Sequence, residues 1–112
     1  GWVQVLRDPR LAKAIYAMHQ RPGVNWKVED LAREAGLSRS LFAERFLAAT
    51  GTTPARYLTE LRMRLAVQYI THEGQALEKV AFSLGYQSLA AFSRAFKRIT
   101  GQPPGALRAT AR

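Results

Sequence analysis

The stretch AREAGLSRSLFAERFLAATGTTP, residues 32–54, has a recognisable second copy, AFSLGYQSLAAFSRAFKRITGQPP, at residues 81–104. Matching positions lie 49 residues apart up to the glycine of each copy, as Ala32 and Ala81 do. After that glycine they lie 50 apart, as Phe42 and Phe92 do, so the second copy has one extra residue just after its glycine. Two copies are too few for a solenoid, and we interpret each as one supersecondary unit.

Each copy has the pattern of a helix, a tight turn and a second helix. The segment VEDLAREAG, residues 28–36, opens with acidic residues, which suits the positive end of a helix dipole. Gly36 can adopt the left-handed conformation that ends a helix and turns the chain. Ser38 is then the expected N-cap of the next helix, and Ser88 is its counterpart in the second copy. This pattern is typical of a helix-turn-helix motif, although ordinary helical hairpins share it.

The second helix of each copy has an apolar side. Residues three or four positions apart are predicted to face inward, namely Leu41, Phe42 and Phe46 in the first copy and Phe92 and Phe96 in the second. We expect the four phenylalanines to be core residues and not stacking platforms for single-stranded nucleic acid. Trp26 and Tyr86 are expected in the core as well.

A long helix is predicted between the copies. Thr53 is its expected cap, Pro54 suits its first position, and ARYLTELRMRLAVQYITHE, residues 55–73, runs without a breaker to Gly74. About 19 residues at ~1.5 Å each make a rod of roughly 28 Å. Successive major-groove faces of B-DNA lie ~34 Å apart, so such a rod could hold two reading heads near that separation. Arg62, beside the apolar stripe Leu58, Leu61, Leu65 and Tyr69, is expected to have a structural role.

Composition limits the class of protein. The 112 residues, 47% hydrophobic, suffice for one compact domain or two small subdomains. The absence of cysteine excludes disulfides, thiolate catalysis and cysteine-ligated zinc. No apolar run approaches the ~18 residues of a membrane span and no signal peptide opens the chain, so we expect no membrane partner and a cytoplasmic location.

The net charge of +9 is uneven along the chain. Residues 79–112 contain six basic residues and no acidic one, whereas residues 1–78 contain eleven basic and eight acidic ones. A basic face attracts polyanions through counterion release, but it can also be a solvated surface. Charge alone leaves both interpretations open.

Signals for catalysis or metal binding are weak. His19 and His72 lie far apart in the sequence, without a neighbouring cysteine or paired acid. No nucleophile, base and orienting acid share a defensible spacing, and there is no glycine-rich phosphate loop. We therefore expect no enzyme activity, no metal and no cofactor.

Three segments resemble a known family. GYQSLAAFSRAFKRITGQPPGALR, residues 85–108, is the most specific, and YLTELRMRLA, residues 57–66, matches the usual connector. Over residues 8–108 the chain resembles the DNA-binding domain of AraC/XylS-type bacterial transcription regulators. DPRLAKAIYAMHQRPGVNWKVEDLA, residues 8–32, looks like the entry helix of the subgroup that follows a cupin-like sensing domain.

The resemblance implies an all-α, two-lobed fold of about seven helices, with two helix-turn-helix subdomains joined by a long connector helix. Residues 1–7 would be a residual linker, and the DNA-binding domain would be 8–112, with subdomains at 8–52 and 74–108 and the connector at 53–73. Both recognition helices would enter adjacent major grooves of double-stranded DNA. An effector-binding and dimerisation domain would be missing from this chain, and an activator would also meet RNA polymerase. The family commonly has Ser or Thr as the cap of the first helix in each unit, where this chain has Lys27 and Ala76. The loss of each cap is expected to lower stability by ~1 kcal/mol.

The exposed faces of the second helices are the candidate DNA interface. The predicted base-reading residues are Arg39, Ser40, Ala43 and Glu44 in the first copy and Leu89, Ala90, Ser93 and Arg94 in the second. Arginine can pair with guanine, glutamate can accept from cytosine, and alanine offers only apolar contact. Leu89 and Ala90 cannot hydrogen-bond a base, which suggests more shape-dependent readout in the second copy. The predicted phosphate contacts are Ser38, Arg45, Ser88, Lys97 and Arg98.

Two function classes compete with sequence-specific DNA binding. A helical protein-interaction domain could use the basic face for an acidic partner, but such interfaces more often expose aromatic anchors. RNA binding is disfavoured because A-form grooves do not admit a reading helix.

Overall fold

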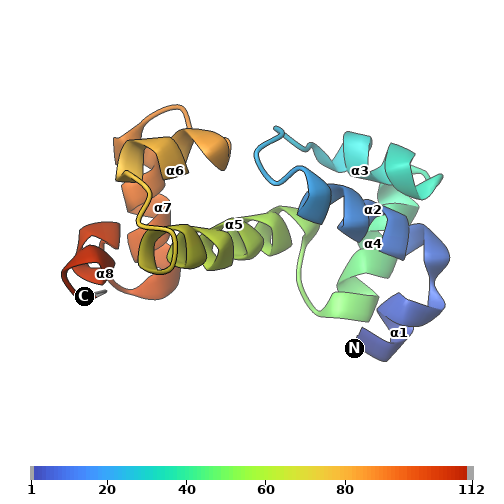
Figure 1. Ribbon diagram of the computed structural model, residues 1–112. Helices are drawn as coiled ribbons and strands as arrows, with labels where there is room; N and C mark the ends of the chain where they lie inside the picture. The colour runs from blue at the N-terminus through green and yellow to red at the C-terminus, as the bar shows by residue number, and fades with distance from the viewer. Residues whose placement is uncertain (1, 111–112) are drawn as a thin grey trace. The chain divides into compact units, whose positions relative to one another are not determined.

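The computed structural model describes residues 2–110, which form eight α-helices and no strand (Figure 1). The all-α class is therefore confirmed. The chain divides into two compact units, which we call unit 1, Gly1–Leu58, and unit 2, Thr59–Arg112. Each unit contains one of the two sequence copies.

Unit 1 consists of α1 (Trp2–Arg7), α2 (Pro9–Gln20), α3 (Val28–Ala35), α4 (Arg39–Thr50) and the start of α5 (Pro54–Thr71). Helix α2 packs on α3 and α4. The Asp8 carboxylate caps α2 by accepting from the backbone N–H groups of Arg10 and Leu11, at 3.1 and 3.3 Å. Phe42 and Phe46 of α4 are fully buried, and Phe46 meets Tyr57 edge-on with ring centroids 5.7 Å apart.

Helix α1 occupies the segment that the sequence predicted to be a linker. It packs against α2 and α4, and its Val5 is 4% exposed. Burial of an apolar side chain is the physical reason that this segment is part of unit 1 and not a linker. It also brings the number of helices in residues 2–110 to eight instead of about seven.

Unit 2 is built from the rest of α5 with α6 (Leu77–Ser83), α7 (Leu89–Thr100) and α8 (Pro104–Thr110). Its core is a single cluster contributed mainly by α5, α6 and α7: Met63, Ala66, Ile70, Val80, Ala81, Leu84, Phe92, Ala95 and Phe96. The predicted connector is α5, capped as expected because the Thr53 hydroxyl accepts from the N–H of Arg56 at 3.2 Å. It ends at Thr71, shortly before Gly74, which has φ +60°.

The turn between the two helices is built alike in both copies. Gly36 and Gly85 have φ of +69° and +90°, a region that glycine enters without strain. The N–H of Leu37 donates to the carbonyl of Ala32, and the N–H of Tyr86 donates to that of Ala81, both at 3.0 Å. Leu37 and Tyr86 are therefore equivalent, which identifies Gln87 as the extra residue of the second copy.

Three apolar positions are less buried than predicted. Leu41 is 37% exposed, and Trp26 and Tyr86 are only half-buried. The reason for Trp26 is its polar edge, which donates from Nε1 to the carbonyl of Arg21 at 2.8 Å. Tyr86 is incompletely buried because it has a polar hydroxyl and a charged neighbour, Arg62. The predictions of core burial for Phe42, Phe46, Phe92 and Phe96 are confirmed.

Candidate nucleic-acid interface

Helices α4 and α7 begin in the same way. The Ser38 hydroxyl accepts from the N–H of Leu41 at 3.2 Å, and the Ser88 hydroxyl accepts from the N–H of Ala91 at 3.0 Å. Both predicted N-caps are thus confirmed. Neither helix has an acidic residue in its first turn, so its own sequence leaves the positive end of the dipole uncompensated. Such a helix start favours a phosphate oxygen.

The predicted reading face of α4 lies in the first two turns of the helix and is mostly exposed. Arg39, Ser40 and Glu44 are exposed and Ala43 is half-buried, while Phe42 and Phe46 are fully buried. Ser40 and Glu44 lie on the side that the core leaves to solvent, whereas Arg39, three residues before Phe42, is exposed at the first position of the helix. Arg45, predicted to contact phosphate, is exposed as well.

Arg39 has a partner that the sequence did not predict. Its Nε lies 2.8 Å from Oε1 of Glu29, in the first turn of α3. Glu29 and Arg39 are ten residues apart, and no helical periodicity connects them, because the turn at Gly36 separates their helices. Only a placement of α3 against α4 could have revealed the pair.

The corresponding face of α7 is more basic. Ala90 and Arg94 are exposed, Leu89 and Ser93 are half-buried, and Lys97 and Arg98 are exposed in the last turn. Lys97 and Arg98 follow Arg94 by three and four residues, so all three lie along one side of the helix. Helix α7 contains no acidic residue, whereas α4 contains Glu44.

Tyr86 and Arg62 support the start of α7. The guanidinium carbon of Arg62 lies 5.6 Å from the centroid of the Tyr86 ring, a cation–π contact. The Tyr86 ring also meets Phe92 of α7 edge-on, with ring centroids 5.6 Å apart and an interplanar angle of 60°. Burial lowers the pKa of the Arg62 guanidinium, which its contact with Tyr86 partly offsets. Burial likewise raises the pKa of the Tyr86 phenol, with Arg62 opposing the shift. The predicted structural role of Arg62 is in keeping with this contact.

The start of α3 and the start of α6 lack side-chain caps, as expected from Lys27 and Ala76. At α3, Asp30 compensates in part, because its Oδ2 accepts from the backbone N–H of Lys27 at 3.0 Å. Its other carboxylate oxygen lies 3.0 Å from Nη2 of Arg33.

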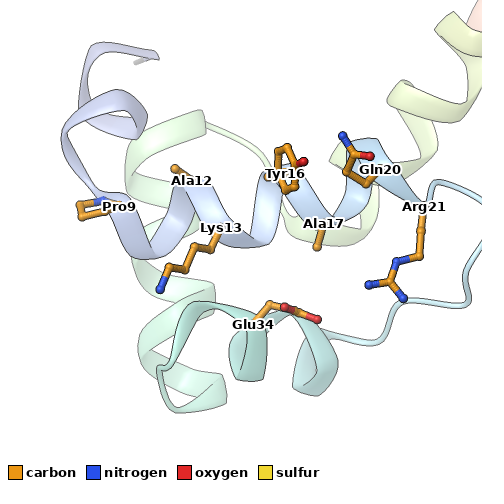
Figure 2. Close-up of a pocket in the computed structure, with 8 residues that line it drawn as sticks. All are labelled: Pro9, Ala12, Lys13, Tyr16, Ala17, Gln20, Arg21 and Glu34. Atoms are coloured by element: carbon orange, nitrogen blue, oxygen red, sulfur yellow. The ribbon is translucent and has the colours of Figure 1, made fainter.

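A separate hollow of about 890 Å³ lies along α2 and α3 in unit 1. Figure 2 shows that Glu34 of α3 faces residues of α2 and of the turn after it across an open groove. Its lining residues are Pro9, Ala12, Lys13, Tyr16, Ala17, Gln20, Arg21 and Glu34. This hollow contains none of the predicted base-reading or phosphate-contacting residues.

Two absences hold for the residues that the structure describes. Among them no group of three His, Asp or Glu side chains is placed to hold a metal ion. None of the helices within residues 2–110 combines the length and apolar character needed to cross a membrane.

Comparison with known proteins agrees with this geometry. A helix-turn-helix domain family matches residues 31–110. The chain is 44% identical over 105 residues to a protein of Streptomyces lividans described as an AraC-like transcription regulator, covering 94% of this chain and 34% of that protein. It is 41% identical over 106 residues to RclR of Escherichia coli, an RCS-specific HTH-type transcriptional activator, covering 95% of this chain and 37% of the relative. The chain thus spans about a third of the length of these curated relatives.

A solved structure is similar over nearly the full chain. The DNA-binding domain of AdpA, a global transcriptional factor, in complex with a target DNA, matches with a TM-score of 0.86 and 30% identity, covering 94% of each chain. Two capped helix-turn-helix units, a continuous helix α5 between the copies and these relatives lead to one assignment. The chain belongs to the AraC family of helix-turn-helix transcription regulators, of which it is a DNA-binding domain.

Proposed function

We propose that this domain reads a specific sequence in double-stranded DNA by inserting α4 and α7 into adjacent major grooves of one duplex. The observation that carries the proposal is the duplicated unit. In both copies the second helix is capped by a serine, and it has buried residues that pack in the core and exposed residues that are accessible to a ligand. The AdpA domain, which shares this fold, was crystallised with its target DNA.

The roles of the two helices differ in this proposal. On α4, Arg39, Ser40, Ala43 and Glu44 read bases, and Ser38 and Arg45 hold phosphates. On α7, Arg94 is the main base-reading residue and Leu89, Ala90 and Ser93 contribute shape. The basic residues Lys97 and Arg98, together with Ser88, hold phosphates. Base contacts then specify the sequence while phosphate contacts set the register.

The whole protein, on this proposal, is a bacterial transcription regulator that acts in the cytoplasm and is not an enzyme. A separate domain, cupin-like as in the resembling subgroup, would sense an effector and dimerise, and an activator would contact RNA polymerase. The length of the curated relatives, about three times that of this chain, leaves room for such a domain.

Selection of binding sites from a random duplex library tests the proposal. We expect an enriched motif of two blocks about one helical turn apart, ~34 Å centre to centre. Arg94→Ala should weaken binding to that motif and relax the preference in one block only. Binding of the motif and of a scrambled duplex should then be compared across a salt series, because phosphate contacts alone give equal affinities.

Three outcomes separate the alternatives. Two blocks support readout by both helices, whereas one block means that one unit reads bases and the other only holds phosphates. Equal binding of the motif and the scramble at every salt concentration, with no enrichment, would contradict sequence-specific binding.

A further inference from the structure

Arg39 and Glu29 form an ion pair between the two helices of unit 1. Arg39 is the first residue of α4, and Glu29 is the second residue of α3. The contact joins Nε of Arg39 to Oε1 of Glu29 at 2.8 Å, with the side chains 67% and 51% exposed. A pair this exposed contributes little to folding, so its main effect is on where the guanidinium lies.

The contact uses one particular edge of the guanidinium. An arginine can present two pairs of parallel donors, one that includes Nε and one made of the two terminal amino groups. Glu29 approaches the Nε side of the guanidinium, and no ion pair of Arg39 with any other residue is seen in the described part of the chain. The terminal pair is therefore the one left for a ligand, and two parallel donors match O6 and N7 of guanine.

We infer that Glu29 is a positioning residue for base recognition, which holds the Arg39 guanidinium so that its terminal edge reads a guanine in the first block of the site. This rests on the proposed function. Without Glu29, the flexible arginine can swing to a phosphate, which binds it equally well in every sequence. Glu29 also repels phosphates, so the pair adds discrimination between bases more than it adds affinity.

The second copy contains a matched control. Glu78 is the second residue of α6, as Glu29 is of α3, and both lie in the first turn of an exposed helix start. The position equivalent to Arg39 is Leu89, which cannot pair with a carboxylate. Glu29→Gln and Glu78→Gln therefore remove the same charge from the same place in a helix, but only the first loses an arginine partner.

The test measures binding of the selected site and of variants with the predicted guanine replaced by each other base. The proteins are the wild type, Glu29→Gln, Glu78→Gln, Arg39→Lys and the double variant Glu29→Gln/Arg39→Lys. Each is first shown by circular dichroism to unfold at a temperature close to that of the wild type. The readout is the discrimination ratio, which is the dissociation constant for the substituted site divided by that for the guanine site, together with the absolute affinity.

We expect Glu29→Gln to lower the ratio about two- to fivefold, the size of an exposed ion-pair effect, while affinity for the substituted sites rises. Glu78→Gln should raise affinity for all sites alike and leave the ratio unchanged. Arg39→Lys, which keeps the charge but loses the paired donors, should lower the ratio further, and Glu29→Gln should then have no additional effect.

The inference is wrong if the wild-type domain discriminates between bases but Glu29→Gln leaves the discrimination ratio unchanged at every position. The proposed function would then still stand. A wild-type domain that prefers no site overturns both. If Glu29→Gln only raises affinity uniformly, as Glu78→Gln does, then Glu29 is merely a negative charge near DNA and positions nothing.

Discussion

At the residue scale, Thr50, the last residue of α4, and Thr52, two residues later, show how differently the same side chain can be used. The Thr50 hydroxyl donates to the carbonyls of Phe46 and Thr52, at 2.7 and 3.1 Å, and accepts from the N–H of Thr52. Thr52 Oγ1 is buried and has no hydrogen-bond partner in the described structure. A buried hydroxyl without a partner loses its hydration and gains nothing in return.

These contrasting environments predict opposite effects of the same substitution. Thr52→Val should leave the free energy of unfolding unchanged or raise it by up to ~1 kcal/mol, because valine has the same shape without the stranded hydroxyl. Thr50→Val should lower it by about 1–2 kcal/mol, because it removes the capping hydrogen bonds. Urea denaturation of the two variants measures both, and a clear loss of stability in Thr52→Val would show that the hydroxyl is satisfied in solution.

Tyr86 predicts a dependence of stability on pH. Burial raises its pKa above the ordinary value of 10.0, so above that pH the unfolded chain loses the phenolic proton before the folded protein does. The stabilisation is complete below pH 10 and declines as the pH rises through the folded pKa, by at most about 1.4 kcal/mol per pH unit for one proton. Tyr86→Phe should have a flatter profile between pH 9 and pH 11.

The matched variant is Tyr16→Phe, which removes a phenol that is 65% exposed and shows whether the loss of any tyrosine changes the slope. Urea denaturation at a series of pH values gives each slope. Equal slopes in wild type and Tyr86→Phe would mean that burial does not raise the pKa of the Tyr86 phenol above that of the unfolded chain.

At the element scale, the ends of the recognition helices depend on backbone conformation more than on packing. Gly51 ends α4 with φ +78° and Gly101 ends α7 with φ +87°, and an added Cβ at either would meet no atom within 4 Å. Space is therefore available, and only the left-handed conformation disfavours another residue. Gly105, in α8, also has space around it but has no positive φ.

Substituting alanine at these three glycines should change the free energy of unfolding in opposite directions. Gly51→Ala and Gly101→Ala should each lower the free energy of unfolding by about 1–2 kcal/mol, the strain of a left-handed alanine. Gly105→Ala should raise it by roughly 0.5–1 kcal/mol, because alanine restricts the unfolded chain and suits a helix. Thermal unfolding of the three variants measures these changes in stability. If Gly105→Ala is less stable than the wild type, the backbone at Gly105 is not helical.

At the scale of the whole molecule, the net charge of +9 predicts that binding to any duplex is strongly salt-dependent. If Lys97 and Arg98 hold phosphates, the double variant Lys97→Gln/Arg98→Gln should reduce the slope of log affinity against log salt by about 2, roughly 0.9 per phosphate. The base preference should be unchanged, since phosphate contacts do not read sequence.

The control for total charge is Arg10→Gln/Lys13→Gln, which removes the same charge from exposed positions of α2. Its slope should stay closer to that of the wild type. Equal losses of slope in both double variants would mean that the salt dependence follows net charge alone, and that Lys97 and Arg98 have no special position on DNA.

The sequence by itself determined the duplicated helix-turn-helix, because its signals are local. A left-handed glycine, a serine cap and apolar residues at helical spacing each act within a few residues, and Gly36, Ser38 and Phe42 with their counterparts in unit 2 were all placed correctly. Base-reading and phosphate roles were assigned from the same local pattern, and remain predictions.

Only the tertiary structure decided the contacts between helices. Glu29 meets Arg39 across a turn, Tyr86 lies between Arg62 and Phe92, and Val5 is buried where the sequence suggested a linker. No periodicity within one helix relates these residues. Their contacts depend on how two helices pack, which is settled by the summed burial of many side chains and not by any single local pattern.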